Sequence, residues 1–410
     1  MNVSPTFSPP IPLMKPYFTL SGLFYLLSML TLFFIDPKIS LQDFSLIGWV
    51  HLYMLGFVMM GIFSAMAQLA PIVVETSHYS IKIFRYLHLF LVSGLAFMLY
   101  GFYIETSFLL YGGSLVFLAM LIYAIEFLLT LKNAQRKTSI TKAMKLSNFF
   151  LLLGIFTGLI MAASFNSLLN INPQIILPMH TFGLIVGFVI LLIMGISIIL
   201  IPMFGSSARI SDNEFSKSFI AIALGVIVMM FAPFFYTEVL TNTAYALVST
   251  AILLYLYQLY TMTSSRKRVI HDIWALHMYV AFGSFIIAFI LLCCYLLTDL
   301  EILLKLGAFL LLLGFFGFII LGNLYKIIPF LVWFHIYSPH IEERVVPMLH
   351  ELLPKRVAYL QLFYSLLGLL IASLGIVLES TIFFKGGAIL LALGALLFLL
   401  AINKILKAKI

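Results

Sequence analysis

Long apolar segments dominate the chain, and short polar breaks separate them. Most segments hold about 18 or more residues with few charges, enough for a helix to cross a hydrocarbon layer of about 30 Å. Proline, charged residues and polar clusters mark the breaks. The pattern predicts twelve transmembrane helices near residues 17–36, 47–74, 81–103, 107–132, 144–165, 177–203, 216–236, 242–263, 270–297, 301–334, 356–378 and 381–403.

Composition supports a lipid environment. Hydrophobic residues make up 63% of the chain and charged residues 9%, whereas a soluble domain carries about 25% charged residues. A soluble core cannot use so much apolar surface. We therefore expect an all-α polytopic membrane protein in a lipid bilayer, with one membrane domain over residues 1–410.

The formal net charge of +8 reports topology rather than a nucleic-acid partner. Basic residues are confined to short loops, and no basic face with interleaved aromatic residues exists. Residues 132–137, 266–268 and 404–409 are basic, while 165–176 and 237–243 hold no Lys or Arg. The positive-inside rule then predicts that both termini face the cytoplasm, as expected for a bacterial inner-membrane protein. The connection over residues 337–356 mixes charged and apolar residues, which predicts a short helix on the membrane surface.

One phrase occurs three times, each time in a long span that runs from outside to inside. It reads Gly56-Phe57-Val58, Gly187-Phe188-Val189 and Gly314-Phe315-Phe316, followed 15 residues after the glycine by Pro71, Pro202 and Pro329. The copies fall in spans two, six and ten, so the repeating unit is four helices. We expect three pseudo-repeats at about residues 17–132, 144–263 and 270–403.

Two histidines lie about one turn inside the outer ends of spans that carry the phrase. His51 precedes its Gly-Phe phrase by five residues and His180 precedes its own by seven. His180, Gly183 and Gly187 share one helix face, where an imidazole can ligate iron while a porphyrin lies flat against the glycines. The alternative is a histidine hydrogen-bonded to a neighbouring helix or to interfacial water.

The remaining histidines lie elsewhere. His88 and His277 are predicted toward the cytoplasmic side, where they can meet across helices as a second metal-ligand pair or serve as buried structural groups. Surface or interfacial roles are expected for His78, His271, His335, His340 and His350. The two cysteines, Cys293 and Cys294, provide no Cys-x-x-Cys-His motif, so any haem is held non-covalently.

The chain resembles subunit I of the haem-copper oxidase superfamily, which includes the cbb3-type cytochrome c oxidases and the nitric oxide reductases. The resemblance rests on twelve spans in three groups of four and on the phrases around His51 and His180, through Pro71 and Pro202-Met203-Phe204. It implies that His51 is an axial ligand to haem b and that His180 lies near a copper-ligand position. It also implies an electron donor, such as a cytochrome subunit, and a small gas such as O2 or NO.

The sequence departs from the family where copper and the second haem would be bound. The family carries a His-His pair in span seven and two histidines in span ten, but residues 217–236 and 301–323 contain none. These losses argue against copper and against full oxidase activity. Haem ligation then has two routes. In the favoured one, His51 pairs with His180, or either acts with Met54 or Met179; in the other, His88 pairs with His277.

Four polar residues extend toward the cytoplasmic side of the repeat spans: Gln68, Asn323, Tyr325 and Lys326. They can form a polar path or hold haem propionates or an anionic substrate, or Lys326 can simply reach the headgroups. Glu126 is expected at the interface, or paired with Lys326. Two functions are therefore open: a haem protein in electron transfer, redox chemistry or sensing of O2 or NO, and a haem-free transporter or scaffold with the same fold.

Overall fold

The computed structural model describes residues 8–135, 137–235, 238–266 and 271–408. These residues form helices joined by short connections, and no strand occurs among them. Arg136, Lys267, Arg268 and Lys409, which contribute to the topology prediction, lie outside the described residues.

The helices follow the predicted spans closely. The α-helices are α1 (Ile11–Leu32), α2 (Phe44–His51), α3 (Met59–Val74), α4 (Leu87–Tyr103), α5 (Phe108–Lys132), α6 (Ser139–Phe165), α7 (Pro173–Thr181), α8 (Leu191–Gly205), α9 (Asp212–Phe235), α10 (Glu238–Ser264), α11 (Ile273–Thr298), α12 (Glu301–Phe309), α13 (Phe318–Val332), α14 (Lys355–Val377) and α15 (Thr381–Leu406). The π-helical segments are η1 (Leu52–Val58), η3 (Phe182–Ile190), η4 (Leu310–Gly317) and η5 (Trp333–Tyr337), and a 3₁₀ segment, η2, covers Ile81–Arg85.

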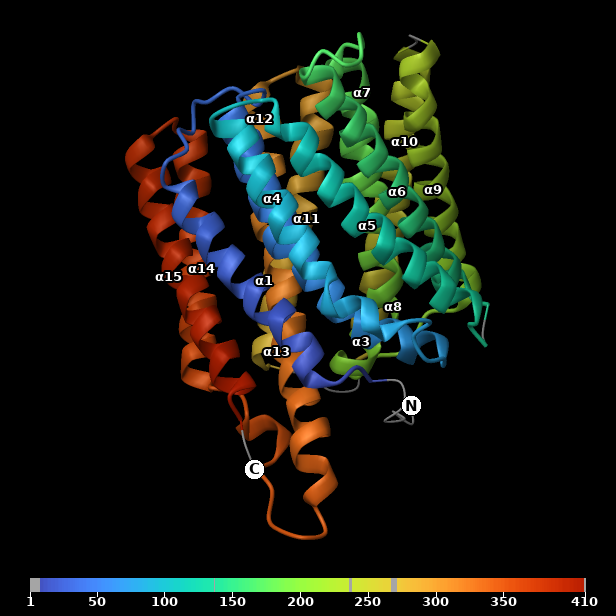
Figure 1. The fold of residues 1–410 in the computed structure, drawn as a ribbon, viewed down its shortest axis with the longest axis vertical. Coiled ribbons are helices and arrows are strands. Elements are labelled where there is room, and N and C mark those ends of the chain that lie inside the picture. Colours follow the sequence, from blue (N-terminus) through green and yellow to red (C-terminus); the bar gives the residue numbers. More distant parts are fainter. Residues whose placement is uncertain (1–7, 136, 236–237, 267–270, 409–410) are drawn as a thin grey trace. The chain divides into compact units, whose positions relative to one another are not determined.

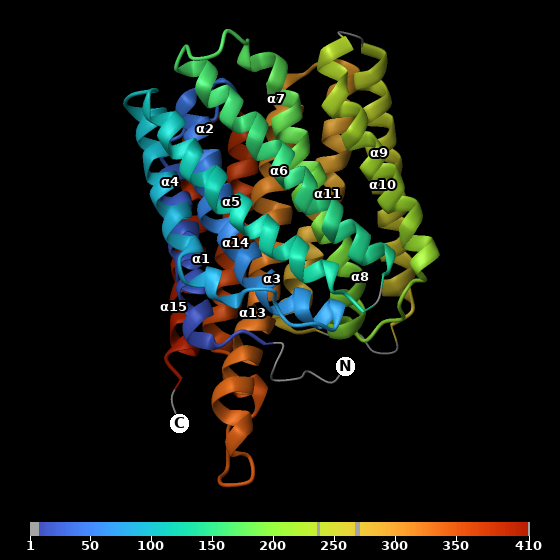
Figure 2. The same ribbon diagram turned by 45° about the vertical axis from the view of Figure 1, so that its right-hand side comes forward.

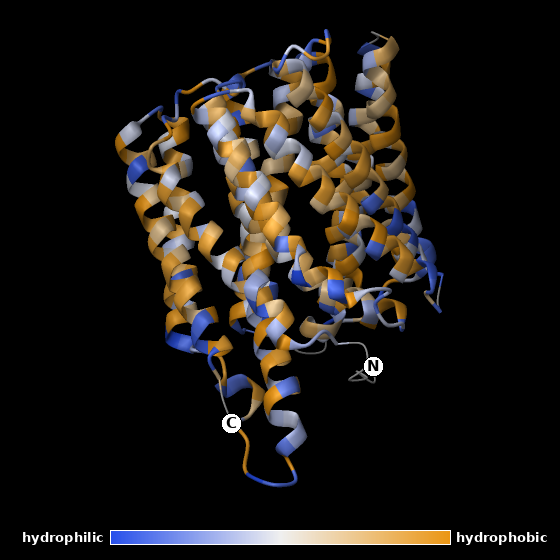
Figure 3. Cartoon of the chain, viewed as in Figure 1, coloured by the Kyte–Doolittle hydropathy of each residue, from blue (hydrophilic) through white to orange (hydrophobic). Residues whose placement is uncertain are grey.

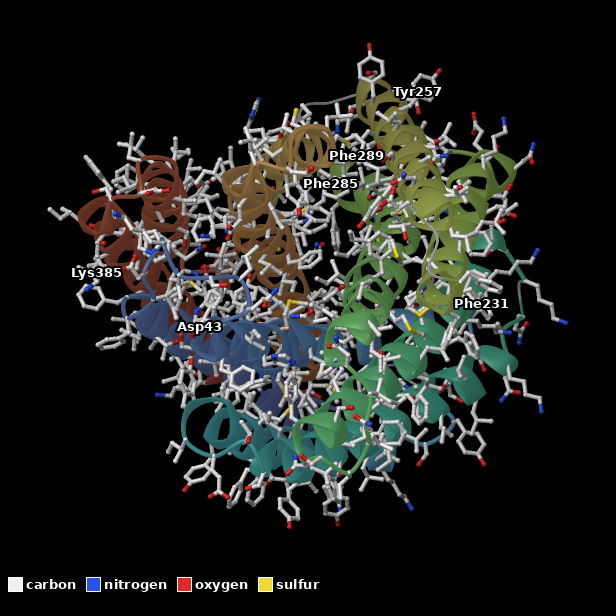
Figure 4. All side chains as sticks on the ribbon, turned by 90° about the horizontal axis from the view of Figure 1, so that it is seen from above. Asp43, Phe231, Tyr257, Phe285, Phe289 and Lys385 are labelled. Atoms are coloured by element: carbon white, nitrogen blue, oxygen red, sulfur yellow. The ribbon has the colours of Figure 1, made fainter. Side chains whose placement is uncertain are left out.

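Ten continuous helices of the described chain are long and apolar enough to cross a membrane. Hydrophobic residues cover the helices and hydrophilic ones gather at the connections (Figure 3). Phe231 and Tyr257 are 56% and 66% exposed and lie on the outside of their helices (Figure 4), as expected for groups that face lipid. The predicted all-α polytopic membrane fold is confirmed at this level. Two further helices, α1 and α4, lie at the first and third predicted spans, and the count of twelve crossings stays a prediction.

The predicted surface helix in the connection before α14 is wrong. The chain there forms only two 3₁₀ turns, η6 (Ser338–His340) and η7 (Leu349–Glu351). Pro339, Pro347 and Pro354 interrupt this segment, and each removes a backbone N–H that a continuous helix would need.

Two compact units account for the contacts, the first comprising Met1–Ser8 with Gln68–Ile270 and the second Pro9–Ala67 with His271–Ile410. In the first unit, α5 packs against α4 and α6, and α9 pairs with α10 (Figure 2). In the second, α14 pairs with α15, which also contacts α1 (Figure 1). The boundary passes through α3, between Ala67 and Gln68.

The three helices that carry the Gly-Phe phrase share one unusual backbone. Each is α-helical before and after the phrase and π-helical around it, in η1, η3 and η4. The α-helix after each phrase ends three residues beyond its proline, at Val74, Gly205 and Val332, and the third then continues as the π-helical segment η5. Since π-helix is rare and costs regular hydrogen bonding, its recurrence at three matching positions reflects a shared packing requirement.

That requirement is contact with the preceding long helix. η1 packs against α1, η3 against α6 and η4 against α11. At each phrase glycine an added Cβ would lie within 3 Å of a side chain from that helix: Phe24 for Gly56, Phe150 for Gly187 and Ser284 for Gly314. The glycines therefore admit a neighbouring helix rather than leaving a gap.

Asx caps fix the starts of two of these helices. Asp43 accepts the Ser45 N–H at 2.8 Å before α2, and Asn172 accepts the Gln174 N–H at 3.0 Å before α7. The hydrogen bonds from the Ser45 hydroxyl and backbone N–H also lower the pKa of Asp43, which lies in the connection before α2 (Figure 4). The caps place the first turn just ahead of each helix's histidine.

Candidate functional site

His180 lies at the junction of α7 and η3 in the first unit, and its imidazole packs against α6. Its Nδ1 is 2.8 Å from the carbonyl oxygen of Gly154. A Cβ at Gly158 would lie 2.7 Å from the imidazole, so this glycine makes room for the ring. Because a carbonyl only accepts, Nδ1 carries the proton, and a neutral imidazole then presents its lone pair at Nε2.

His51 occupies the corresponding junction of α2 and η1 in the second unit. Its Nδ1 lies 2.8 Å from the carbonyl oxygen of Ile47, one turn earlier in the same helix. The same tautomer follows, with the lone pair at Nε2. The two predicted ligands thus share a protonation pattern, although His51 belongs to one unit and His180 to the other.

The glycine face next to His180 is filled by protein. A Cβ at Gly183 would meet the Met230 side chain at 2.6 Å, and one at Gly187 would meet the Phe150 ring at 2.9 Å. Both glycines are buried. The predicted flat surface for a porphyrin is therefore used for packing against α6 and α9.

His277, on α11 in the second unit, is completely buried, and protein groups engage both ring nitrogens. Nδ1 is 2.8 Å from the carbonyl oxygen of Ile273, and Nε2 is 3.0 Å from the side-chain amide of Gln361 on α14. That amide also lies 3.0 Å from the Ser365 hydroxyl. In the structure Gln361 Oε1 faces His277 Nε2, and Gln361 Nε2 donates to the Ser365 hydroxyl. A neutral imidazole with its proton on Nδ1 accepts at Nε2, so it pairs with the amide after a flip that exchanges the amide O and N. His277 is thus a structural group that joins α11 to α14.

The second predicted pair is divided between the units, since His277 belongs to the second and His88 to the first. His88 lies near the start of α4, partly buried. Among the described residues, no three His, Cys, Asp or Glu side chains are arranged to hold a metal ion. Ligation of iron by one or two imidazoles requires no such group, so it stays a prediction.

The predicted polar path is divided between the units. Gln68 belongs to the first unit, where its Oε1 accepts from the Ser8 hydroxyl at 2.9 Å. Asn323 and Lys326 belong to the second, where Asn323 Oδ1 accepts from the Trp274 indole at 3.2 Å. Tyr325 is 2% exposed, and its ring packs edge-on against that of His277 at 5.6 Å.

Lys326 is held by an ion pair rather than extended freely to the headgroups. Its Nζ lies 2.6 Å from Asp272 Oδ2, with about a third of each side chain exposed. The other oxygen of Asp272 accepts the Ala275 N–H at 3.0 Å and caps α11. The aspartate therefore has two separable roles, in a cap and in a surface ion pair.

Asp272→Asn is expected to cost less than about 1 kcal/mol in the free energy of unfolding, because Asn caps helices well and exposed ion pairs contribute little. Asp272→Ala should cost about 1–2 kcal/mol because it removes the cap as well. Detergent-induced unfolding monitored by circular dichroism would measure both losses. Equal losses for the two variants would show that Asp272 stabilises the protein mainly through its ion pair with Lys326 and not through the cap of α11.

Glu126 has its partners within the first unit. It is 3% exposed on α5, where its Oε1 accepts from the Thr130 hydroxyl at 2.8 Å and lies 3.0 Å from His78 Nδ1. Thr130 in turn accepts the Tyr79 N–H at 3.0 Å. His78, assigned a surface role from its place in a loop, therefore anchors the connection between α3 and α4. Sequence position alone gave no sign of this, since the partners are 48 residues apart.

Comparisons with known proteins leave the family assignment as a prediction. No protein-family model matches the chain. The search of curated proteins likewise found no significant match. The resemblance to haem-copper oxidase subunit I therefore rests on the repeated phrase, the two histidines and the predicted number of spans.

Proposed function

We propose that this chain is a haem-binding membrane protein related to subunit I of the haem-copper oxidases, with twelve crossings in three groups of four. Both termini face the cytoplasm of a bacterial inner membrane, as the loop charges favour. The shared α–π–α form of the three phrase-bearing helices supports the threefold arrangement. Contact of each π segment with the preceding long helix also supports it.

The observation that carries the haem proposal is the common tautomer of His51 and His180. In each, Nδ1 donates to a backbone carbonyl at 2.8 Å. Metal-ligating histidines usually donate their second N–H in this way, which orients the ring and raises the basicity of Nε2. The donor chemistry of both side chains therefore suits haem iron.

Other predicted cofactor residues fit haem poorly. His277 already uses both nitrogens, and Gly183 and Gly187 are covered by Met230 and Phe150. We therefore propose His51 and His180, each within its own unit, as haem ligands, without His277 and without the glycine face. A bound haem supplies one-electron transfer and an iron site for O2 or NO. The chain's part is to hold each imidazole in its neutral form and to surround it with apolar side chains.

The optical spectrum of purified protein from haem-replete cells tests this proposal. A Soret band and, after reduction, b-type α and β bands are expected. His51→Ala or His180→Ala should remove or shift these bands, because each removes a proposed iron ligand. His340→Ala is the control, since His340 is a loop histidine 2.7 Å from Glu343. A colourless, iron-free wild-type preparation would refute haem binding.

Filling of the glycine face favours a second candidate, a haem-free transporter or scaffold with the same fold. Under that reading, His51 and His180 serve helix packing, as the contact of His180 with Gly158 illustrates. Their replacement should then lower thermal stability without any spectral change. The spectrum of the wild-type protein separates the two candidates directly.

A further inference from the structure

A basic groove lies in the second unit, where α14 begins and α15 ends. Its volume is about 670 Å³, and its lining includes Lys355, Arg356, Lys404, His350 and Glu351. Lys355 and Arg356 form the first turn of α14, while Lys404 lies in the last turn of α15. Three permanent cations from two helices and one carboxylate therefore meet at one groove.

The groove favours an anion through its backbone as well as its side chains. Pro354 precedes the first residue of α14, and the first intrahelical bond runs from the Ala358 N–H to the Pro354 carbonyl. The earlier N–H groups of that turn have no partner within the helix and give its start a partial positive charge. Glu351, whose Oε2 accepts the Met348 N–H at 2.8 Å, offsets only part of this charge, because the lining holds three Lys or Arg side chains and one carboxylate.

The location of the groove at the end of two membrane helices indicates that the anion is part of a lipid. Both α14 and α15 are long and apolar enough to span a bilayer, so their joined ends lie where the chain leaves the hydrocarbon layer. Leu353 and Val357 add apolar surface to the same lining. A phosphate group with an attached glycerol and acyl chains fits cations beside apolar surface better than free phosphate does.

We propose that this groove binds the phosphate headgroup of an anionic phospholipid from the cytoplasmic leaflet. Lys355, Arg356 and Lys404 contact the phosphate, and the first turn of α14 faces it. The bound lipid links the start of α14 to the end of α15 and stabilises this helix pair. The site is independent of haem, because it uses none of the histidines proposed as ligands.

The test uses the purified full chain in neutral detergent. Phosphatidylglycerol, phosphatidylcholine or inorganic phosphate is added, and native mass spectrometry and thermal unfolding report binding. The variant K355Q/R356Q/K404Q removes the three cations. The variant K132Q/K142Q/K217Q removes three cations from helix ends of the first unit and controls for net charge.

Phosphatidylglycerol should bind and raise the unfolding temperature of the wild type and of the control variant, and phosphatidylcholine should do so much less. Each groove cation should contribute about fivefold in affinity, so the groove variant should bind phosphatidylglycerol about a hundredfold more weakly. The single variant K404Q, at an exposed position, should show the fivefold loss even if the triple variant does not fold.

Two results would overturn the proposal. One is equal weakening in the groove and control variants, which would mean general attraction to positive charge. The other is a shift by inorganic phosphate as large as that by phosphatidylglycerol, which would assign the groove to free phosphate rather than to lipid.

Discussion

Gly387→Ala should destabilise the protein by about 1–3 kcal/mol, whereas Gly386→Ala one residue earlier should be neutral or slightly stabilising. A Cβ at Gly387 would meet the backbone of Ala372 on α14, which cannot move without separating the helices. A Cβ at Gly386 would have no neighbour within 4 Å. The two substitutions add the same methyl group to the same turn of α15, so only the helix contact differs between them.

The reason for a large effect is the way α14 and α15 associate. Lipid is as apolar as these helices, so they gain little from the hydrophobic effect and depend on close packing. Gly368 and Gly375 on α14, with Gly387 and Gly394 on α15, supply that closeness at matched spacings of seven residues. Thermal unfolding in detergent would compare the variants. Equal stability of the Gly386 and Gly387 variants would contradict this account of the pair.

His277→Leu should cost about 2–3 kcal/mol, because it leaves the buried Gln361 amide without its partner across the helices. Gln361→Leu should cost a similar amount for the converse reason. The double replacement should cost less than the sum of the two, since an apolar pair leaves neither group unsatisfied. A coupling energy of about 1 kcal/mol is expected for a hydrogen bond between membrane helices.

Chemical or thermal unfolding of the wild type, the two single variants and the double variant measures this coupling energy. Strict additivity would mean that the bond between His277 and Gln361 contributes nothing. The optical spectrum supplies a second readout, because neither replacement should alter haem bands if His51 and His180 are the ligands. Loss of haem from His277→Leu with the fold intact would instead make His277 a ligand.

Hydropathy alone predicted the membrane fold and the approximate bounds of nearly every helix. The prediction from hydropathy succeeds because lipid cannot satisfy backbone hydrogen bonds, so long apolar segments must become helices. The constant spacing of Gly56, Gly187 and Gly314 from their prolines also indicates that the three helices are equivalent. It did not reveal the π-helical segments, because π geometry depends on what a neighbouring helix brings to each glycine.

The candidate site shows the limit of sequence reasoning more sharply. A glycine face beside His180 is the same pattern whether it admits a flat ligand or a neighbouring helix. Only the packing shows that Met230 and Phe150 occupy it. His277 was predicted as a possible metal ligand, yet its partner Gln361 is 84 residues away and gave no local signal.

Hydropathy was enough to predict a helical membrane protein, because lipid solvation acts on each segment separately, and two of the three helices with the Gly-Phe phrase carry a histidine. The packing of the helices shows what the polar residues do. In the structure Lys326 pairs with Asp272, Glu126 with His78 and His277 with Gln361. These pairings depend on which helices pack together. In lipid, shape and hydrogen bonding between distant segments decide that packing, and hydrophobicity discriminates little among partners.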